Sequence, residues 1–390
     1  MGRSDDFRTL RRPARSQLTA ATLLAAALVM PGDGATAAPP LSVRDVAVPA
    51  SAFPVAVFGS DDRIDTPPAY QSVTDKVGVI LDLGQKTVCT AFCVAPASVA
   101  TAAHCLFPHG ERSRTRLANI RFRKSLAGAA GEARVEGARE GATDLNVATG
   151  SRTLSLRPPI DADADWALIR LDRPVCPAGG LPLSRRSTEE IVTLAREGRL
   201  YNIAFHRDFG NFSPALGAPC DVSRSFPRAS WETIARDFRA PEDIVLHTCD
   251  TGGSSSGSPI LVDGRDGPEV VAINVGTYLQ SDVVSSVRER TSARAASTST
   301  RAIANTAIAA HAIADTAAAF TTDGLLSSRR AIRDLKKRLM RHRAYHGPID
   351  GRSDSRLRDA ISSFEQRIGR PVTGLPTERL RRHLEAYPVR

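Results

Sequence analysis

Residues 249–260 read Cys-Asp-Thr-Gly-Gly-Ser-Ser-Ser-Gly-Ser-Pro-Ile, a glycine- and serine-rich turn that leads into an apolar run. A stretch of this composition is often a flexible loop. Here a cysteine at one end and an apolar strand from Pro259 at the other predict a loop that is held in place. Such a turn can expose a serine hydroxyl and direct backbone N–H groups at a developing negative charge.

Short β-branched runs separated by turn residues surround this loop along the chain. They include residues 77–81, 99–102, 166–169 and 270–273. This pattern predicts an all-β fold. Residues 125–153 are rich in Gly, Ala and charge, so we expect a long surface insertion there. Residues 303–320 are Ala-rich and predict a last strand followed by a closing helix.

Two further segments offer the partners that a nucleophilic serine needs, a histidine that takes its proton and a carboxylate that orients the histidine. The segment TAAHC places His104 at the end of an apolar strand. Asp165 directly precedes another apolar run, whereas Asp161 and Asp163 lie further from it, so Asp165 is preferred. A histidine near a strand end is usually structural. A catalytic role for His104 is therefore indicated only when the other two segments are considered with it.

The three segments together resemble the trypsin/chymotrypsin-like serine peptidases, and most closely their bacterial glutamyl-endopeptidase-like branch. The motifs TAAHC, DWALIRL and SSGSP match in type and in order, and residues 58–63 (FGSDDR) resemble the opening segment of that branch. The resemblance predicts a peptidase domain over residues 55–321. It implies an all-β, chymotrypsin-like double antiparallel barrel, with six strands in each barrel and the site in the cleft between them.

The resemblance also implies a role for individual residues. Ser256 takes the position of the nucleophile, His104 that of the general base and then acid, and Asp165 that of the residue that orients His104. The N–H groups of Ser254 and Ser256 are expected to form the oxyanion hole. The family usually has Gly where this chain has Ser254, and a wrongly turned peptide there would cost about 3 kcal/mol of transition-state stabilisation. Ser255 replaces the Asp that binds the new N-terminus in animal digestive enzymes, so that activation is not expected.

Substrate specificity is less determined by the sequence. Asp250 and Thr251 precede the nucleophile at distances that suggest the primary specificity pocket. Asp250 either favours a basic substrate side chain or caps the loop, and both readings stay open. Glutamyl-specific relatives carry a His where this chain has Asn274, so a glutamate preference is not expected. The chemistry needs no metal or organic cofactor, and a structural calcium ion stays open.

The first 38 residues predict a signal peptide. Arginines between residues 11 and 15 form a basic region, the apolar run 18–30 is short for a membrane span, and residues 35–37 are small. We expect cleavage near Ala37, with a membrane anchor as the alternative. Residues 39–54 are expected to be a linker or short pro-segment. Export predicts a secreted, periplasmic or cell-envelope protein.

In an oxidising compartment, the six cysteines are more readily disulfides than metal ligands, and none has CxxC spacing. Cys89 lies 16 residues before Cys105, which would staple the strand pair that presents the histidine. On the resemblance, Cys220 pairs with Cys249. Cys93 and Cys176 either pair with each other or stay free.

The tail from about residue 328 differs in kind. Its apolar residues fall at helical spacing in two groups, with turn residues between them: Ile332, Leu335 and Leu339, then Leu357, Ile361, Phe364 and Ile368. Residues 329–385 resemble the peptidoglycan-binding-like helical domain, which predicts a small all-α domain over 328–386. The whole formal net charge of +10 lies between Arg329 and Arg390.

That charge would attract an anionic envelope polymer such as peptidoglycan, lipid headgroups or acidic proteins, or be a solvated face without a partner. No nucleic acid partner is expected after export. The sequence thus predicts an exported serine endopeptidase that hydrolyses peptide bonds through an acyl-enzyme, with a basic, envelope-targeting tail. One alternative is an inactive, peptidase-like wall-binding module, which Ser254 favours. Another is a processing enzyme whose tail inhibits the cleft until it is removed.

Overall fold

The computed structural model describes residues 56–107, 117–125, 131–138, 146–226, 229–280, 282–284 and 302–387, with only the backbone of 282–284. The signal peptide predicted over residues 1–38 and the linker over 39–54 lie outside the described residues. Within the ranges above, none of the helices has the length and apolarity that crossing a membrane requires.

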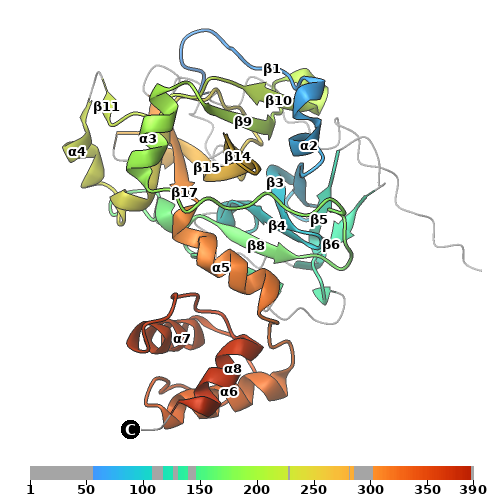
Figure 1. The fold of residues 1–390 in the computed structure, drawn as a ribbon, viewed down its shortest axis with the longest axis vertical. Helices are drawn as coiled ribbons and strands as arrows, with labels where there is room; N and C mark the ends of the chain where they lie inside the picture. The colour runs from blue at the N-terminus through green and yellow to red at the C-terminus, as the bar shows by residue number, and fades with distance from the viewer. Residues whose placement is uncertain are drawn as a thin grey trace, which may run out of the picture. The chain divides into compact units, whose positions relative to one another are not determined.

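The first half of the chain forms a seven-stranded antiparallel sheet (Figure 1). Its spatial order is β6-β5-β2-β3-β4-β8-β7. The strands are β2 (Val77–Asp82), β3 (Thr87–Ala95), β4 (Ser98–Thr101), β5 (Ile120–Arg123), β6 (Ala133–Arg134), β7 (Val147–Thr149) and β8 (Ala167–Arg170). The predicted runs 77–81, 99–102 and 166–169 all lie in its central strands.

The stretch 125–153 was expected to be a surface insertion, and this prediction is wrong for residues 133–135 and 147–149. β6 pairs with β5, and β7 pairs with β8. Ala133, Val135 and Val147 are buried in the core. Small apolar residues scattered among Gly and charged residues are enough to form short edge strands once a neighbouring strand supplies the hydrogen bonds.

Strands of the second half, joined by β1 from the N-terminal segment, form an eight-stranded antiparallel sheet in the order β1-β10-β9-β14-β15-β17-β13, with β16 paired to β15. The strands are β1 (Ile64–Asp65), β9 (Leu200–Phe205), β10 (Pro214–Gly217), β13 (Ile244–His247), β14 (Pro259–Gly264), β15 (Gly267–Leu279), β16 (Asp282–Val284) and β17 (Ala302–Ala309). β11 (Ser225–Phe226) and β12 (Ala229–Ser230) form a separate hairpin. The sheets confirm the all-β class, although they have seven and eight strands rather than six each.

Helices are few in this part of the chain. The described α-helices before the tail are α2 (Gln71–Thr74), α3 (Thr188–Arg196), α4 (Trp231–Ala235) and α5 (His311–Thr322). The apolar face of α3 shares a core with strands of the second sheet, including Val245 and Ile260. β17 followed by α5 is the predicted last strand and closing helix (Figure 1).

Thr90 on β3 connects the two sheets at the point where the site lies. Its hydroxyl accepts a hydrogen bond from the N–H of Phe205 on β9 and donates one to the carbonyl of Ser254. Its own N–H donates to the carbonyl of Ser256 at 2.9 Å. Thr90 is fully buried. The loop that precedes β14 in the second sheet is therefore fastened to the first sheet.

The tail has a core of its own, built by α6 (Arg329–Arg341), α7 (Ser355–Arg367) and α8 (Glu378–Ala386). Each helix begins at a side-chain cap, provided by Ser328, Asp354 and Thr377. The first two helices confirm the apolar spacing read from the sequence. α8 was not predicted, because it buries only Leu380 and Leu384, too short a pattern to stand out.

Candidate active site

His104 lies in a short 3-10 turn, Ala103–Cys105, directly after β4, and it is fully buried. Its ring Nδ1 is 2.7 Å from Oδ2 of Asp165. Its backbone N–H donates to Oδ1 of the same carboxylate at 2.9 Å. The two contacts fix the ring relative to its own backbone, which a single contact would not do.

The structure distinguishes between the three neighbouring aspartates. Asp161 accepts a hydrogen bond from the N–H of Ser155 and pairs with Arg239 at 2.7 Å. Burial raises the pKa of Asp163 to about 6. Among the three, Asp165 is the one whose carboxylate contacts His104, as preferred from the sequence.

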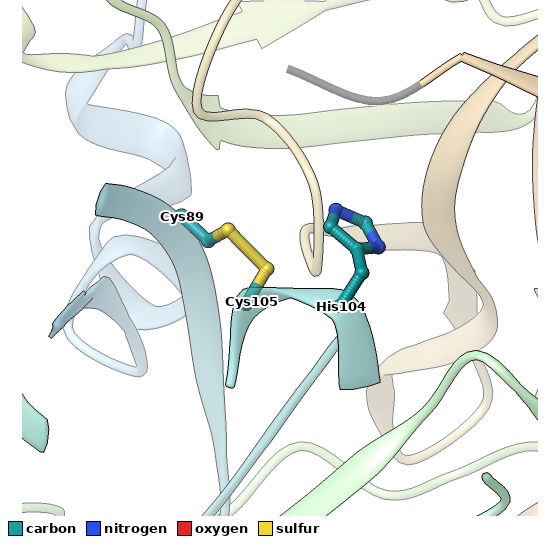
Figure 2. A group of neighbouring side chains, drawn as sticks. All are labelled: Cys89, His104 and Cys105. Atoms are coloured by element: carbon teal, nitrogen blue, oxygen red, sulfur yellow. A yellow bond between two sulfur atoms is a disulfide. The ribbon is translucent and has the colours of Figure 1, made fainter. Parts of the chain in front are cut away.

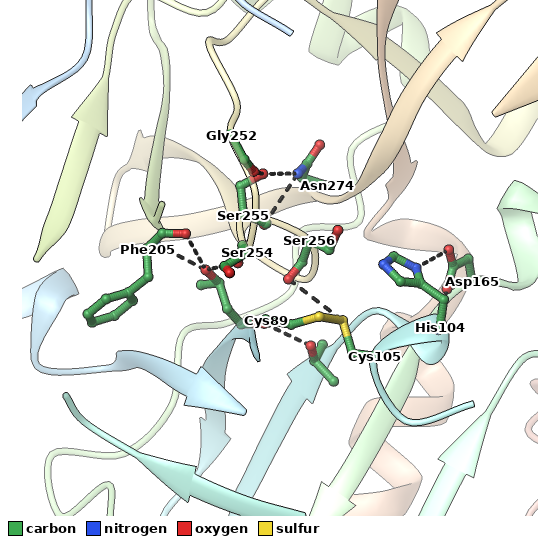
Figure 3. The surroundings of a disulfide bond; sticks show 12 residues. Cys89, His104, Cys105, Asp165, Phe205, Gly252, Ser254, Ser255, Ser256 and Asn274 are labelled. Atoms are coloured by element: carbon green, nitrogen blue, oxygen red, sulfur yellow. Dashed lines mark hydrogen bonds and ion pairs between the residues drawn. A yellow bond between two sulfur atoms is a disulfide. The ribbon is translucent and has the colours of Figure 1, made fainter. Parts of the chain in front are cut away.

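Ser256 lies at the end of the Gly/Ser loop, just before β14, and is buried. In Figure 3 the His104 ring lies between Asp165 and the side chain of Ser256. The carbonyl of Ser256 accepts from the N–H of Thr90 and lies 3.9 Å from Sγ of Cys105. The predicted Ser256, His104 and Asp165 are thus brought together from two sheets.

Ser254 has φ +81°, in the region that favours glycine. The carbonyl of Gly253 shares a peptide with the Ser254 N–H and accepts from the N–H of Arg207 at 2.7 Å, while the carbonyl of Ser254 itself accepts from the Thr90 hydroxyl at 2.9 Å. Within the described ranges, the N–H groups of Ser254 and Ser256 donate to no other backbone group. Ser254 therefore adopts the backbone conformation that Gly usually supplies at this position, despite its β-carbon.

Asn274 on β15 supports the same loop from the other side. Its side-chain Nδ2 donates to both the carbonyl and the hydroxyl oxygen of Ser255, each at 3.2 Å. Its Oδ1 can then only accept, and Nε2 of the buried His247 donates to it at 3.1 Å. Burial lowers the pKa of His247 to about 4, so this histidine is neutral. His247 was not singled out from the sequence, because only folding brings it beside Asn274.

Asp250 and Thr251 contact the N-terminal segment. Asp250 is 2% exposed, and its two oxygens accept from the N–H groups of Phe58 at 2.8 Å and Asp62 at 3.0 Å. Thr251 forms an antiparallel bridge with Ala56. Of the two readings of Asp250, these contacts match the loop-capping carboxylate.

The structure contains the three disulfides Cys89–Cys105, Cys93–Cys176 and Cys220–Cys249. The first and third are the expected pairs, and the second resolves the alternative that the sequence left open. Cys89, His104 and Cys105 lie close enough together to suggest a metal site (Figure 2). Their two sulfurs are bonded to each other, so this cluster offers no thiolate to a metal ion.

Residues 89–273 match the family model "Trypsin-like peptidase domain", and residues 328–384 match "Putative peptidoglycan binding domain". No curated protein matches the sequence. A solved Glu endopeptidase in complex with MPD is 16% identical, with a TM-score of 0.42, and the match covers 68% of this chain and 98% of that one.

Two proteins from Vibrio cholerae give similar values. VesB protease is 13% identical over 69% of each chain, with a TM-score of 0.42. The secreted serine protease VesC is 12% identical over 68% of this chain and 49% of its own, with a TM-score of 0.43. These three similarities are too low to carry an argument, so the assignment rests on the family models. The chain therefore contains a trypsin-like serine peptidase domain and, after it, a peptidoglycan-binding domain.

Proposed function

We propose that this chain is an exported serine endopeptidase in which Ser256, His104 and Asp165 form the catalytic triad. The observation that carries the proposal is the double contact of the Asp165 carboxylate to the His104 ring and backbone. A carboxylate in this position keeps a proton on Nδ1 and leaves Nε2 as the basic nitrogen. It also stabilises the imidazolium that forms when Nε2 takes a second proton.

The reaction then proceeds in two halves. Ser256 Oγ attacks the peptide carbonyl carbon while Nε2 of His104 takes the hydroxyl proton, which gives a tetrahedral oxyanion. The N–H groups of Ser254 and Ser256 stabilise that oxyanion. His104 passes its proton to the leaving amine, and an acyl-enzyme remains. A water molecule, deprotonated by His104, repeats the attack and releases the acid and free Ser256.

The orientation of Ser254 favours this function over an inactive binding module. The module was suggested by the β-carbon of Ser254, which makes a positive φ costly by about 1–2 kcal/mol. The structure adopts that φ nonetheless, and Thr90 and Ser255 hold the loop on either side. Backbone strain of this kind is typically found at functional sites, so its presence at Ser254 favours a catalytic role for the loop.

Labelling with a fluorophosphonate probe tests the proposal directly. The probe reacts with a serine only where base and oxyanion hole are both assembled. We expect the purified, disulfide-intact protein to be labelled once per chain and Ser256→Ala to be unlabelled. Ser258→Ala is the matched control, because Ser258 lies two residues after Ser256 in the same loop. This variant should still be labelled. A folded wild type that takes no label would favour the inactive module.

The location and the tail belong to the same proposal. Residues 1–38 would be the export signal, 39–54 a linker or pro-segment, 55–321 the peptidase and 328–386 the envelope-binding domain. The support for binding is a row of exposed basic residues on α6: Arg329, Arg330, Arg333, Lys337 and Arg341. Such a row favours anionic wall polymers over neutral ones.

Co-sedimentation of the full chain with insoluble peptidoglycan tests the tail. We expect binding that weakens as salt is raised, and a loss of binding when Arg333, Lys337 and Arg341 are all changed to Gln. Changing the exposed Arg173, Arg199 and Arg236 of the peptidase to Gln removes equal charge and should leave binding intact. If the triple tail variant instead gains peptidase activity, the tail is an inhibitor of the cleft.

A further inference from the structure

The loop from Cys249 to Ser256 is fastened from outside along its length. The carbonyl of Cys249 accepts from the side chain of Asn305 on β17. The N–H of Gly252 donates to Nδ1 of His206 at 3.1 Å, and the carbonyl of Gly253 accepts from the N–H of Arg207 at 2.7 Å. A preorganised loop of this kind is what an oxyanion hole requires, because donors that must first turn are of little use in the transition state.

The buried guanidinium of Arg63 lies behind this loop. Its side chain is 2% exposed and forms forked contacts with two carboxylates. Nε and Nη2 donate to Asp61 at 2.8 and 2.7 Å. Nη1 and Nη2 donate to Asp208 at 3.3 and 2.9 Å. The guanidinium also lies 5.3 Å from the ring centre of Phe209. Arg63 therefore ties the N-terminal segment to the segment that follows β9.

The Arg63–Asp208 ion pair packs directly against Gly252. A β-carbon on Gly252 would lie 1.9 Å from Oδ1 of Asp208 and 2.8 Å from Nη1 of Arg63. Real β-carbons do not approach other atoms this closely, so the glycine backbone fills the space that the pair leaves. The ion pair thus sets the position of Gly252, two residues before Ser254.

The N-terminal segment makes a second connection to the same loop. Phe58 and Asp62 donate their N–H groups to the Asp250 carboxylate, and Ala56 bridges Thr251. Residues 56–63 therefore hold the loop at Asp250 and Thr251, while Arg63 and Asp208 hold it at Gly252. The motif FGSDDR was noted in the sequence only as a family feature. These contacts indicate that it holds the loop before Ser256 in place.

We propose that Arg63 is a positioning residue of the oxyanion hole, which acts by holding Asp208 against Gly252. The proposal rests on the proposed peptidase function. Arg63 touches no reacting atom. Its guanidinium gives two N–H contacts to each of two carboxylates, a forked geometry that the ammonium of a lysine cannot reproduce. If the pair loosens, the peptides of Gly252 and Gly253 can turn and take the N–H of Ser254 with them.

Arg63→Lys tests the proposal through the rate of fluorophosphonate labelling and through kcat and KM for a peptide substrate. We expect labelling rate and kcat to fall about 10- to 100-fold, below the 10²–10³-fold loss known for complete removal of one oxyanion donor. KM should change little, because the hole binds the transition state rather than the substrate. A merely structural role would lower the melting temperature and leave kcat per folded molecule unchanged.

Arg123→Lys is the matched control. Arg123 is also buried, and its Nε and Nη2 both contact Oε2 of Glu132, at 2.7 and 2.6 Å, in the first sheet. Among the described residues, the side-chain hydrogen bonds and ion pairs of Arg123 do not reach the loop of Ser256. We expect a comparable loss of stability in this variant and a labelling rate within threefold of wild type. Equal losses of labelling in both lysine variants would overturn the proposal.

A double-mutant cycle at Gly252 and Asp208 tests the same contact without changing Arg63. Gly252→Ala alone should slow labelling, because its β-carbon meets the Asp208 carboxylate. Adding Asp208→Ala removes that carboxylate, so the double variant should be no slower than Asp208→Ala alone. Independent, multiplying effects would refute the contact as the route of action. If the wild type takes no label, both the peptidase function and this proposal are overturned. If the wild type is labelled and Arg63→Lys is labelled at the same rate, only this proposal is overturned.

Discussion

The Asp165 carboxylate binds His104 at two points, the ring Nδ1 at 2.7 Å and the backbone N–H at 2.9 Å. Both residues are buried, so water does not compete for either contact. The pair joins the turn after β4 to a residue two positions before β8, and β4 and β8 are neighbours in the first sheet. The imidazole orientation is therefore built into the sheet.

Asp165→Asn is expected to lower kcat by about 10⁴-fold while the fold is retained. The amide can fill the same space, but its NH₂ group favours the wrong tautomer of His104 and cannot stabilise the imidazolium. Steady-state kinetics and a melting curve measure the two effects separately. Asp163→Asn is the control, since Asp163 is two residues away and the carboxylate contacts of His104 described above are those of Asp165. A similar loss of kcat in both variants would contradict the assignment of Asp165.

Ser254→Gly is expected to raise stability by about 1 kcal/mol and to keep or increase kcat. Glycine adopts φ +81° without the steric cost that the β-carbon of serine brings. The hydroxyl lost is a buried one that makes no hydrogen bond within the described parts of the chain. Denaturant unfolding and the labelling rate check the two expectations. A slower Ser254→Gly enzyme would show that the serine side chain has a role of its own.

His247 makes the stability depend on pH. Burial lowers its pKa from 6.5 to about 4 in the folded state. Between these values the unfolded chain holds more protons, so the free energy of unfolding falls as the pH drops from about 6.5 to about 4. The glutamine in His247→Gln can still donate to Asn274 but does not titrate. The free energy of unfolding of this variant should therefore fall less steeply with decreasing pH, with a slope that corresponds to about one bound proton fewer. Urea unfolding at several pH values tests this. Above pH 7 the two curves should run parallel, and equal slopes below pH 6 would refute the assignment.

The three residues of the proposed triad could be named from the sequence because each lies in a short motif beside an apolar strand. Ser256, His104 and Asp165 were chosen from these motifs and their order, without long-range information. The choice among the three aspartates was made on adjacency to a strand, and the structure supplies the reason. Only Asp165 is positioned by the start of β8 to reach the turn after β4.

The support of the site could not be predicted in the same way. Phe58 and Asp250 are 192 residues apart, and nothing local in either segment indicates that one caps the other. The same holds for Arg63 and Asp208, which are 145 residues apart. Edge strands such as β6 were missed because two residues carry no readable period. Local patterns predict elements and motifs, whereas contacts between distant loops depend on the whole fold.

Lys336 is the residue on which we expect the tail domain to depend most. It is fully buried in α6, and its ammonium lies 2.7 Å from Asp350 and 3.5 Å from Asp354, the cap of α7. The hydrogen bond to Asp350 and the charge of Asp354 help hold the pKa of Lys336 above its usual value against the effect of burial. The pair thus ties α6 to the turn before α7 and to the start of α7 itself.

Lys336→Met is expected to destabilise the helical domain by about 1–3 kcal/mol. The methionine fits the site, but it leaves two carboxylates without their cation, and the cost is moderated because both are partly exposed. Faster proteolysis of the tail and weaker sedimentation with peptidoglycan should accompany normal fluorophosphonate labelling. Arg356→Met is the control, since Arg356 is exposed on α7, outside the basic row of α6, and its loss removes equal charge without breaking a buried pair. If Lys336→Met also abolished labelling, the peptidase would need an intact tail, and the two domains could not be treated as independent in function.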